Sequence, residues 1–234
     1  TALHEVHGIY SDQNSAPGGS SQISNTNQIL VSSQRSSPSA QIYAAVYGIR
    51  VQGGAVSNSG EIVASNIAGE SYGIKNAVSA GSGSVTNTGF ISAKIDDGFG
   101  YGIWFEGSGN VTNARGVTVG GYSGQAYDGN QASLTKGVGI YFSGPGVLTN
   151  TGTVGVRAGR GELYGIQQQA NGSGGVNGGG VNSLNRFNNS GTITAQIANA
   201  DASNSSATGV AINAVSSGSI AAVNSGTIIA QSGW

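Results

Sequence analysis

Residues that could perform acid–base or nucleophilic chemistry are scarce in this sequence. The two histidines, His4 and His7, stand near the start of the chain, with Asp12 close by. A serine hydroxyl brought against one of them would complete the serine, histidine and aspartate arrangement that activates a nucleophile. The alternative is that His7 occupies a position that tyrosine fills elsewhere in the chain, where its ring only packs.

Acidic side chains form a second candidate site. They recur in segments that precede a Gly-Ile or Gly-Val pair, at Glu70, Asp96, Asp97, Asp128, Glu162 and Asp201. Enzymes that cleave polysaccharides use two such carboxylates, one as an acid and the other as a base or nucleophile. Basic residues share these segments, at Arg35, Lys94, Lys136, Arg157 and Arg160. Three interpretations stay open: a solvated edge of mixed charge, a groove that binds a cation or a sugar, and a catalytic site.

Two large aromatic residues, Trp104 and Tyr141, each follow a Gly-Ile pair directly. Both are expected on the outer side of a strand, ~4.8 Å apart if the two strands pair. Flat aromatic side chains on a polar wall can stack on a sugar ring or on a partner protein. Lateral packing against another copy of the chain is one alternative. Coverage of Trp104 by the insertion between Val119 and Lys136 is the other.

Other kinds of site find little support. Cysteine is absent and the net charge is -1, so there is neither a thiolate site nor a basic stripe for nucleic acid. The glycines form no complete dinucleotide-binding or phosphate-binding motif and no calcium-binding nonapeptide. No segment approaches the ~18 apolar residues of a membrane span. We expect no enzymatic activity, no cofactor, no metal ion and no nucleic-acid partner.

Composition limits the elements that could position these residues. Glycine accounts for 42 of 234 residues and charged residues for only 8%, which disfavours helix. Such a bias also suits a flexible linker, yet 37% of the residues are apolar. Whether the chain folds therefore depends on where its valines and isoleucines stand.

One phrase, Asn-Ser/Thr-Gly-x-Ile-x-Ala, recurs in four close and three looser copies. The copies begin at Asn25, Asn58, Asn87, Asn113, Asn150, Asn189 and Asn224, which are 26 to 39 residues apart. An apolar residue stands two positions before each of these asparagines. A fixed pattern at this spacing is typical of a solenoid in which each repeat forms one coil.

A second phrase, Gly-Ile or Gly-Val, alternates strictly with the first. Its copies begin at Gly8, Gly48, Gly73, Gly102, Gly139, Gly165 and Gly209. Both phrases alternate apolar and other residues with a period of two, which indicates short β-strands. We therefore predict an all-β fold in which residues 1–234 form one domain, a single-stranded parallel β-helix of about seven coils that start near these glycines.

Turn chemistry fits this prediction. Asparagine tolerates a left-handed backbone and glycine supplies positive φ, so Asn-x-Gly can turn the chain between two strands. Stacked coils would align the seven asparagines in a ladder, each side-chain amide bonded to the next. Asn27 and Arg115 stand where the other five copies have glycine, so at Arg115 the sequence does not support the same turn geometry for the fourth coil. An aromatic column is expected before Gly-Ile, at Tyr47, Tyr72, Tyr101 and Tyr164.

Over residues 7 to 230 these phrases resemble the passenger repeats of autotransporters and filamentous-haemagglutinin-like surface proteins. That family carries degenerate Asn-Ser-Gly-Thr-Ile-x-Ala and Tyr-Gly-Ile phrases on a β-helix. The resemblance implies a right-handed coil and a bacterial protein that is extracellular or on the cell surface. The motifs are structural, and the family includes adhesins, toxins, matrix components and proteases with grafted domains. No segment of this chain resembles a grafted catalytic domain.

The repeats run close to both ends of the given sequence, from His7 to Ala230. Terminal strands of a solenoid present unpaired backbone groups and apolar side chains. Either the chain is a piece of a longer passenger, or copies stack head to tail, with Val6 and Trp234 as candidate contact residues. Stacking of this kind does not close, and it generates a filament.

Two functions follow as expectations. The first is a non-enzymatic extracellular structural β-solenoid, an adhesin or a biofilm matrix component. It would self-assemble into filaments and contact a cell surface or carbohydrate through its corner loops or through Trp104 and Tyr141. The second is a carbohydrate-active or sugar-binding β-helix, a polysaccharide lyase, hydrolase or tailspike-like module. It would require Asp96, Asp97 and Asp128 to converge.

Overall fold

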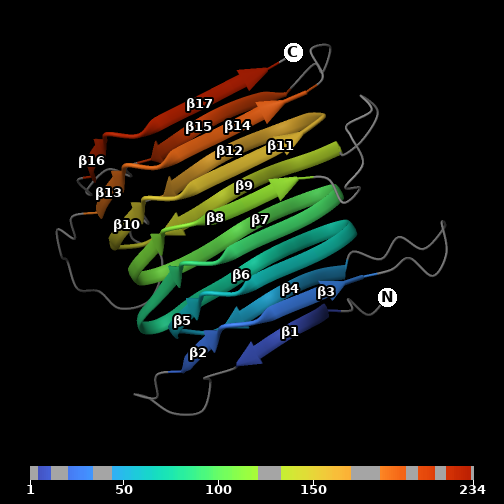
Figure 1. Ribbon diagram of the computed structural model, residues 1–234, viewed down its shortest axis with the longest axis vertical. Helices are drawn as coiled ribbons and strands as arrows, with labels where there is room; N and C mark the ends of the chain where they lie inside the picture. Colours follow the sequence, from blue (N-terminus) through green and yellow to red (C-terminus); the bar gives the residue numbers. More distant parts are fainter. Residues whose placement is uncertain are drawn as a thin grey trace.

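The computed structural model describes residues 5–11, 21–33, 44–120, 133–169, 185–198, 205–213 and 220–232. These ranges consist of strands and turns, and no helix in them is long and apolar enough to cross a membrane. The strands are β1 (Glu5–Ser11), β2 (Gln22–Asn25), β3 (Gln28–Ser32), β4 (Ala44–Val51), β5 (Gly54–Asn58), β6 (Glu61–Asn87), β7 (Phe90–Asn113), β8 (Gly116–Gly120), β9 (Ser133–Ser143), β10 (Gly146–Asn150), β11 (Thr153–Ala158), β12 (Arg160–Gln169), β13 (Asn185–Asn189), β14 (Thr192–Ile197), β15 (Ser206–Asn213), β16 (Ile220–Asn224) and β17 (Thr227–Ser232). Figure 1 shows them stacked in chain order, with β1 and β17 at opposite ends of the molecule.

All the strand pairings are parallel, and they fall into three series. The Gly-Ile series contains β1, β4, β6, β7, β9, β12 and β15. The asparagine series contains β2, β5, β6, β7, β10, β13 and β16. The third series contains β3, β6, β7, β8, β11, β14 and β17. Because β6 and β7 take part in all three series, the strands form one large parallel sheet that is not closed.

Register in each series follows the sequence repeat. Asn25 pairs with Asn58 in the asparagine series, although 33 residues separate them. Asn150 pairs with Asn189 across a separation of 39 residues. Insertions therefore change the length of a connection without shifting the register of the phrases themselves, and each position of a phrase becomes a column in the structure.

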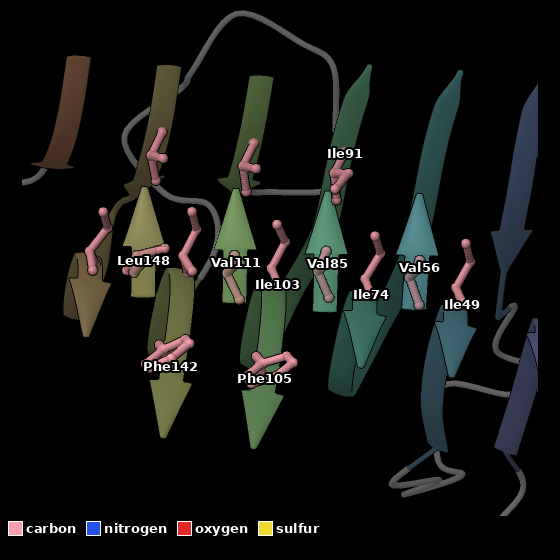
Figure 2. Close-up of a cluster of buried hydrophobic side chains, with 14 of the residues drawn as sticks. Ile49, Val56, Ile74, Val85, Ile91, Ile103, Phe105, Val111, Phe142 and Leu148 are labelled. Carbon is pink, nitrogen blue, oxygen red and sulfur yellow. The ribbon is translucent and has the colours of Figure 1, made fainter. Parts of the chain in front are cut away.

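The core lies between the series and is built from these columns. Isoleucines of the Gly-Ile series, such as Ile74 and Ile103, face valines of the asparagine series, such as Val85 and Val111, and all four are fully buried. Figure 2 shows the rows running along the stack, with Phe105 beside Phe142. Burying one such side chain contributes about 1.5–3 kcal/mol, so the fold is stabilised repeat by repeat.

Glycine in the Gly-Ile phrase makes room for the core. A Cβ atom added at Gly73 would lie 2.2 Å from Cγ2 of Ile91 and 2.6 Å from the carbonyl oxygen of Gly102. The isoleucine of the third series thus packs directly against bare backbone. A larger residue at this position would force the two layers apart.

Glycine at the corner after asparagine has a different role from the one expected from the sequence. Positive φ is not used at Gly60, Gly89 or Gly191, so that expectation was wrong. A Cβ atom at Gly89 would instead lie 2.0 Å from the carbonyl oxygen of Gly60, which shows that close stacking of backbones excludes a side chain. In the fourth repeat the hydrogen bond from the Gly116 amide to the Gly89 carbonyl lengthens to 3.3 Å, against 2.9 Å for the equivalent bond one repeat earlier. The Arg115 guanidinium lies 4.3 Å from the centre of the Phe90 ring.

Candidate functional site

The outer side of the Gly-Ile series carries a continuous column of aromatic rings. His7, Tyr47, Tyr72 and Tyr101 lie in register on β1, β4, β6 and β7. Their successive ring centres are 4.9, 5.0 and 5.0 Å apart, and neighbouring planes differ by at most 11°. We call these four residues the aromatic stack. His7 thus occupies the tyrosine position of the first repeat, in agreement with the packing alternative.

Trp104 and Tyr141 form a second aromatic pair beside this stack. They pair in register between β7 and β9, and their ring centres are 4.1 Å apart. Trp104 also meets Tyr101 edge to face at 4.6 Å. Tyr141 is only 8% exposed and Trp104 is half-buried, so much of their flat surface is used within the chain. The indole Nε1 of Trp104 is buried and has no hydrogen-bond partner.

Two cations lie against the aromatic rings. The Lys75 ammonium is 4.5 Å from the centre of Tyr72, 5.5 Å from Trp104 and 5.7 Å from Tyr47. The Arg50 guanidinium is 4.9 Å from the centre of Tyr47. Attraction between a cation and the face of a ring contributes about 0.5–2 kcal/mol, depending on burial. Burial lowers the pKa of Lys75, while the charge of Glu70 acts in the opposite direction.

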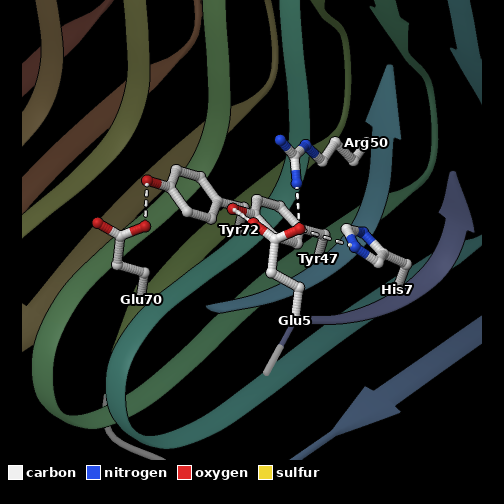
Figure 3. Close-up of polar contacts among 6 residues, drawn as sticks. All are labelled: Glu5, His7, Tyr47, Arg50, Glu70 and Tyr72. Carbon is white, nitrogen blue, oxygen red and sulfur yellow. Dashed lines mark hydrogen bonds and ion pairs between the residues drawn. The ribbon is translucent and has the colours of Figure 1, made fainter. Parts of the chain in front are cut away.

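Two carboxylates, those of Glu5 and Glu70, contact the polar groups of the aromatic stack (Figure 3). The Tyr72 hydroxyl donates to Glu70 at 2.9 Å. Glu5 accepts from Tyr47 at 3.4 Å, lies 3.3 Å from Nε2 of His7, and forms an ion pair with Arg50.

These surroundings hold the tyrosine hydroxyls in their protonated form. Burial, reinforced by the charge of Glu5, raises the pKa of Tyr47 to about 12. Burial and the charge of Glu70 raise the pKa of Tyr72 further. At neutral pH the hydroxyls of Tyr47 and Tyr72 donate hydrogen bonds to Glu5 and Glu70.

Sequence reasoning identified the tyrosines but missed the roles of Lys75, Arg50 and Glu5. Lys75 and Arg50 fill the outer position after Gly-Ile in neighbouring repeats, the position that Trp104 fills in the fourth. A cation in the same column as an aromatic residue is the signal that could have predicted these contacts.

In the described part of the chain, the register pairings set no acidic residue opposite another acidic residue. Asp97 is exposed, and its register neighbours are Ala68 and Ser133. Glu70 has Ala45 and Phe99 as register neighbours. Asp96 is half-buried, while Asp128 and Asp201 lie outside the described residues. No group of three histidine or acidic residues in the described ranges could hold a metal ion.

The seven asparagines form one continuous ladder through the corner of the stack. Each Nδ2 donates to Oδ1 of the asparagine in the next repeat, at 2.6 to 2.8 Å, in the order Asn25, Asn58, Asn87, Asn113, Asn150, Asn189, Asn224. Five of the asparagines are at most 2% exposed, so they keep both a buried donor and a buried acceptor satisfied.

The two ends of the stack leave strands with one neighbour each. β15, β16 and β17 pair only with β12, β13 and β14 among the described strands, and every residue of β17 is exposed. At the other end β1, β2 and β3 pair only with β4, β5 and β6. Val6 is half-buried and pairs with Val46, whereas Trp234 lies outside the described residues.

Comparison of the chain with protein-family models, with curated proteins and with solved structures found no match. The resemblance to autotransporter passenger repeats therefore depends on the sequence phrases alone.

Proposed function

We propose that the three series are the faces of a single-stranded, right-handed parallel β-helix of about seven coils, formed by residues 1–234 as one domain. The supporting observation is that the repeated phrases keep one register in all three series through seven repeats, with register shifts only in the segments between phrases. Right-handedness follows from the resemblance to autotransporter passenger and filamentous-haemagglutinin-like repeats.

In this proposal the chain is a non-enzymatic structural protein of the bacterial exterior, an adhesin or a matrix component. It assembles head to tail into filaments. The observation that carries this function is the pair of exposed end strands on either side of an uninterrupted seven-member asparagine ladder. A stack whose backbone groups are used between repeats is stiff along its axis, while its open ends can pair with another copy.

The carbohydrate-active alternative has weaker support. Asp97 and Glu70 have no acidic neighbour in register, and the phenols of the aromatic stack stay protonated at neutral pH. A polysaccharide screen of the wild type and Asp97→Ala tests it. We expect neither protein to release reducing ends or unsaturated products, and turnover that Asp97→Ala abolishes would revive this alternative.

Electron microscopy of the purified chain tests the structural proposal. We expect fibres with an axial repeat of ~34 Å, which is seven coils at ~4.8 Å each. Isolated short rods at high protein concentration would contradict it.

A matched pair of variants makes the test specific to the exposed end. Ala230→Lys places a charge on the inner side of β17, where a second copy would have to pack, and we expect no fibres. Gln231→Lys adds the same charge one residue away, on the outer side, and we expect fibres as in the wild type. Equal fibre formation by the two variants would show that this edge is not the contact.

A further inference from the structure

The asparagine ladder has a direction, so its two ends differ. In each repeat Nδ2 points toward the C-terminal neighbour and Oδ1 accepts from the N-terminal neighbour. At the first end, Oδ1 of Asn25 accepts from the backbone amide of Asn27, at 3.2 Å, and from no other group of the described residues. At the last end, the one acceptor that the described residues offer Nδ2 of Asn224 is the carbonyl of Gly226, at 3.2 Å. Among the described residues, one end therefore has acceptor capacity and the other has donor capacity to spare.

The core residues at the two ends of the stack belong to the same columns and could pack against each other. Inside the stack, Ile29 pairs with Ile62 in the third series. Ile228 is the last member of the same column and is 39% exposed. A second copy placed in the same register would set its Ile29 against Ile228. The contact would repeat the one that Ile29 already makes with Ile62.

Two exposed aliphatic residues stand in one outer column at opposite ends. Leu30 is 63% exposed and Ile229 is 39% exposed. The members between them are Val63 and then the smaller residues Ser92, Thr118, Gly155 and Thr194. Within one chain Leu30 and Ile229 are six coils apart, whereas head-to-tail stacking would make them neighbours and cover both.

Charge does not oppose such contact. The described residues of the last repeat, 205–213 and 220–232, contain no Asp, Glu, Lys or Arg. At the first end, residues 5–11 and 21–33 contain one acidic side chain, Glu5, and one histidine, His7, and no Asp, Lys or Arg. Soluble proteins usually protect open strand edges with charges, especially lysine, or with proline. The described strands of the last end carry neither, and those of the first end carry only Glu5, whose charge is paired with Arg50.

We propose that β15, β16 and β17 of one copy pair in parallel with β1, β2 and β3 of the next at a single register, with Asn224 beside Asn25 and Ile228 beside Ile29. The junction continues the ladder by a hydrogen bond from Asn224 Nδ2 to Asn25 Oδ1, and the filament is polar. This inference depends on the proposed self-assembly and adds its register and direction. A slip of one residue turns the core side chains outward, and a slip of two sets the amide of Asn224 against Ile23 or Asn27.

Thiol cross-linking tests the register, because the chain contains no cysteine. We mix the single variants Leu30→Cys and Ile229→Cys and add a short bifunctional thiol reagent that fluoresces only when both arms have reacted. We expect a fluorescent covalent dimer from this mixture. The control mixture of Ile229→Cys with Gln28→Cys, which reports a slip of two residues, should give little product.

Microscopy of the same samples separates the two proposals. Filaments that give no Leu30–Ile229 product, or that favour the Gln28 pair, would overturn the register while leaving self-assembly intact. Absence of both filaments and product would overturn both proposals. Slow hydrogen exchange, in dilute and unassembled protein, at the β17 amides that point away from β14 would show that a segment of the same chain covers the edge, and this too would overturn the inference.

The ladder bond itself is tested by Asn224→Ala. Its side chain is exposed in the free chain, so we expect little loss of folding but about a tenfold rise in the critical concentration for assembly. Gln231→Ala, at an exposed residue of the neighbouring strand β17, should leave that concentration within about twofold. An Asn224→Ala protein that assembles like Gln231→Ala would refute the shared ladder.

Discussion

Removal of a central asparagine should be far more damaging than removal of the last one. Asn87 is fully buried; its Nδ2 donates to Oδ1 of Asn113 at 2.8 Å, and its Oδ1 accepts from Nδ2 of Asn58 at 2.8 Å. In Asn87→Ala the Asn113 oxygen loses this donor. Nδ2 of Asn58 retains only two longer contacts, to the carbonyl of Gly60 at 3.3 Å and to the carbonyl of Phe90 at 3.4 Å.

The expected magnitude follows from these contacts. A buried polar group left without a partner costs about 1–3 kcal/mol, and a lost hydrogen bond about 1 kcal/mol more. Asn87→Ala should therefore lower the free energy of unfolding by about 2–4 kcal/mol. Asn224 is exposed, and water can replace its bonds, so Asn224→Ala should cost less than about 1 kcal/mol.

Equilibrium urea unfolding followed by circular dichroism measures this difference, at protein concentrations where microscopy shows no filaments. Stacked repeats can unfold in parts, so hydrogen exchange should accompany it and show the loss concentrated around Asn87. Two results would refute the reasoning: the same destabilisation by both substitutions, or a cost for Asn87→Ala below about 0.5 kcal/mol. Either would mean that the ladder does not stabilise the corner.

Three further predictions concern other columns. Gly73→Ala should lower the urea midpoint strongly because its Cβ would meet a core side chain at 2.2 Å, whereas Gly155→Ala, with open space around the added Cβ, should change stability by less than about 1 kcal/mol. The pKa of Tyr72 is raised on folding, so its stabilising effect is complete below pH ~10 and is lost as pH rises above that, by up to ~1.4 kcal/mol per pH unit. Unfolding measured from pH 8 to pH 11.5 should show this loss, and Tyr72→Phe should reduce it. Lys75→Ala should cost about 1 kcal/mol and, measured in parallel, Lys75→Arg less, because the arginine keeps a cation near the rings.

The columns of the fold could be predicted from the sequence alone. Asn58, Ile62 and Tyr72 belong to phrases that recur at fixed offsets, and parallel in-register pairing turns each recurring offset into a column. The all-β class, the alternation of core and outer residues and the aromatic column all follow from that rule. Insertions of variable length obscure the period but do not change the offsets within a phrase.

Other features could not be predicted because they depend on distances between columns. Positive φ was expected for the corner glycines, and the structure instead shows a carbonyl oxygen 2.0 Å from where a Cβ of Gly89 would be. Lys75 lies among three rings because of the distances between side chains on the outer face, and the spacing of residues in the sequence does not give these distances. The absence of an acidic residue opposite Asp97 likewise depends on the register across β6, β7 and β9.

The sequence by itself determined what repeats: which residues are core, which turn the corner and which asparagines stack. Only the tertiary structure decided the direction of the asparagine ladder and the hydrogen-bonding groups that it presents at its two ends. Hydrogen bonds between identical asparagines must point one way along the stack, and that direction appears only when Nδ2 and Oδ1 are placed in space. The physical reason is that an amide has a donor side and an acceptor side. A finite ladder of amides therefore ends in one spare acceptor and one spare donor, at Asn25 and Asn224.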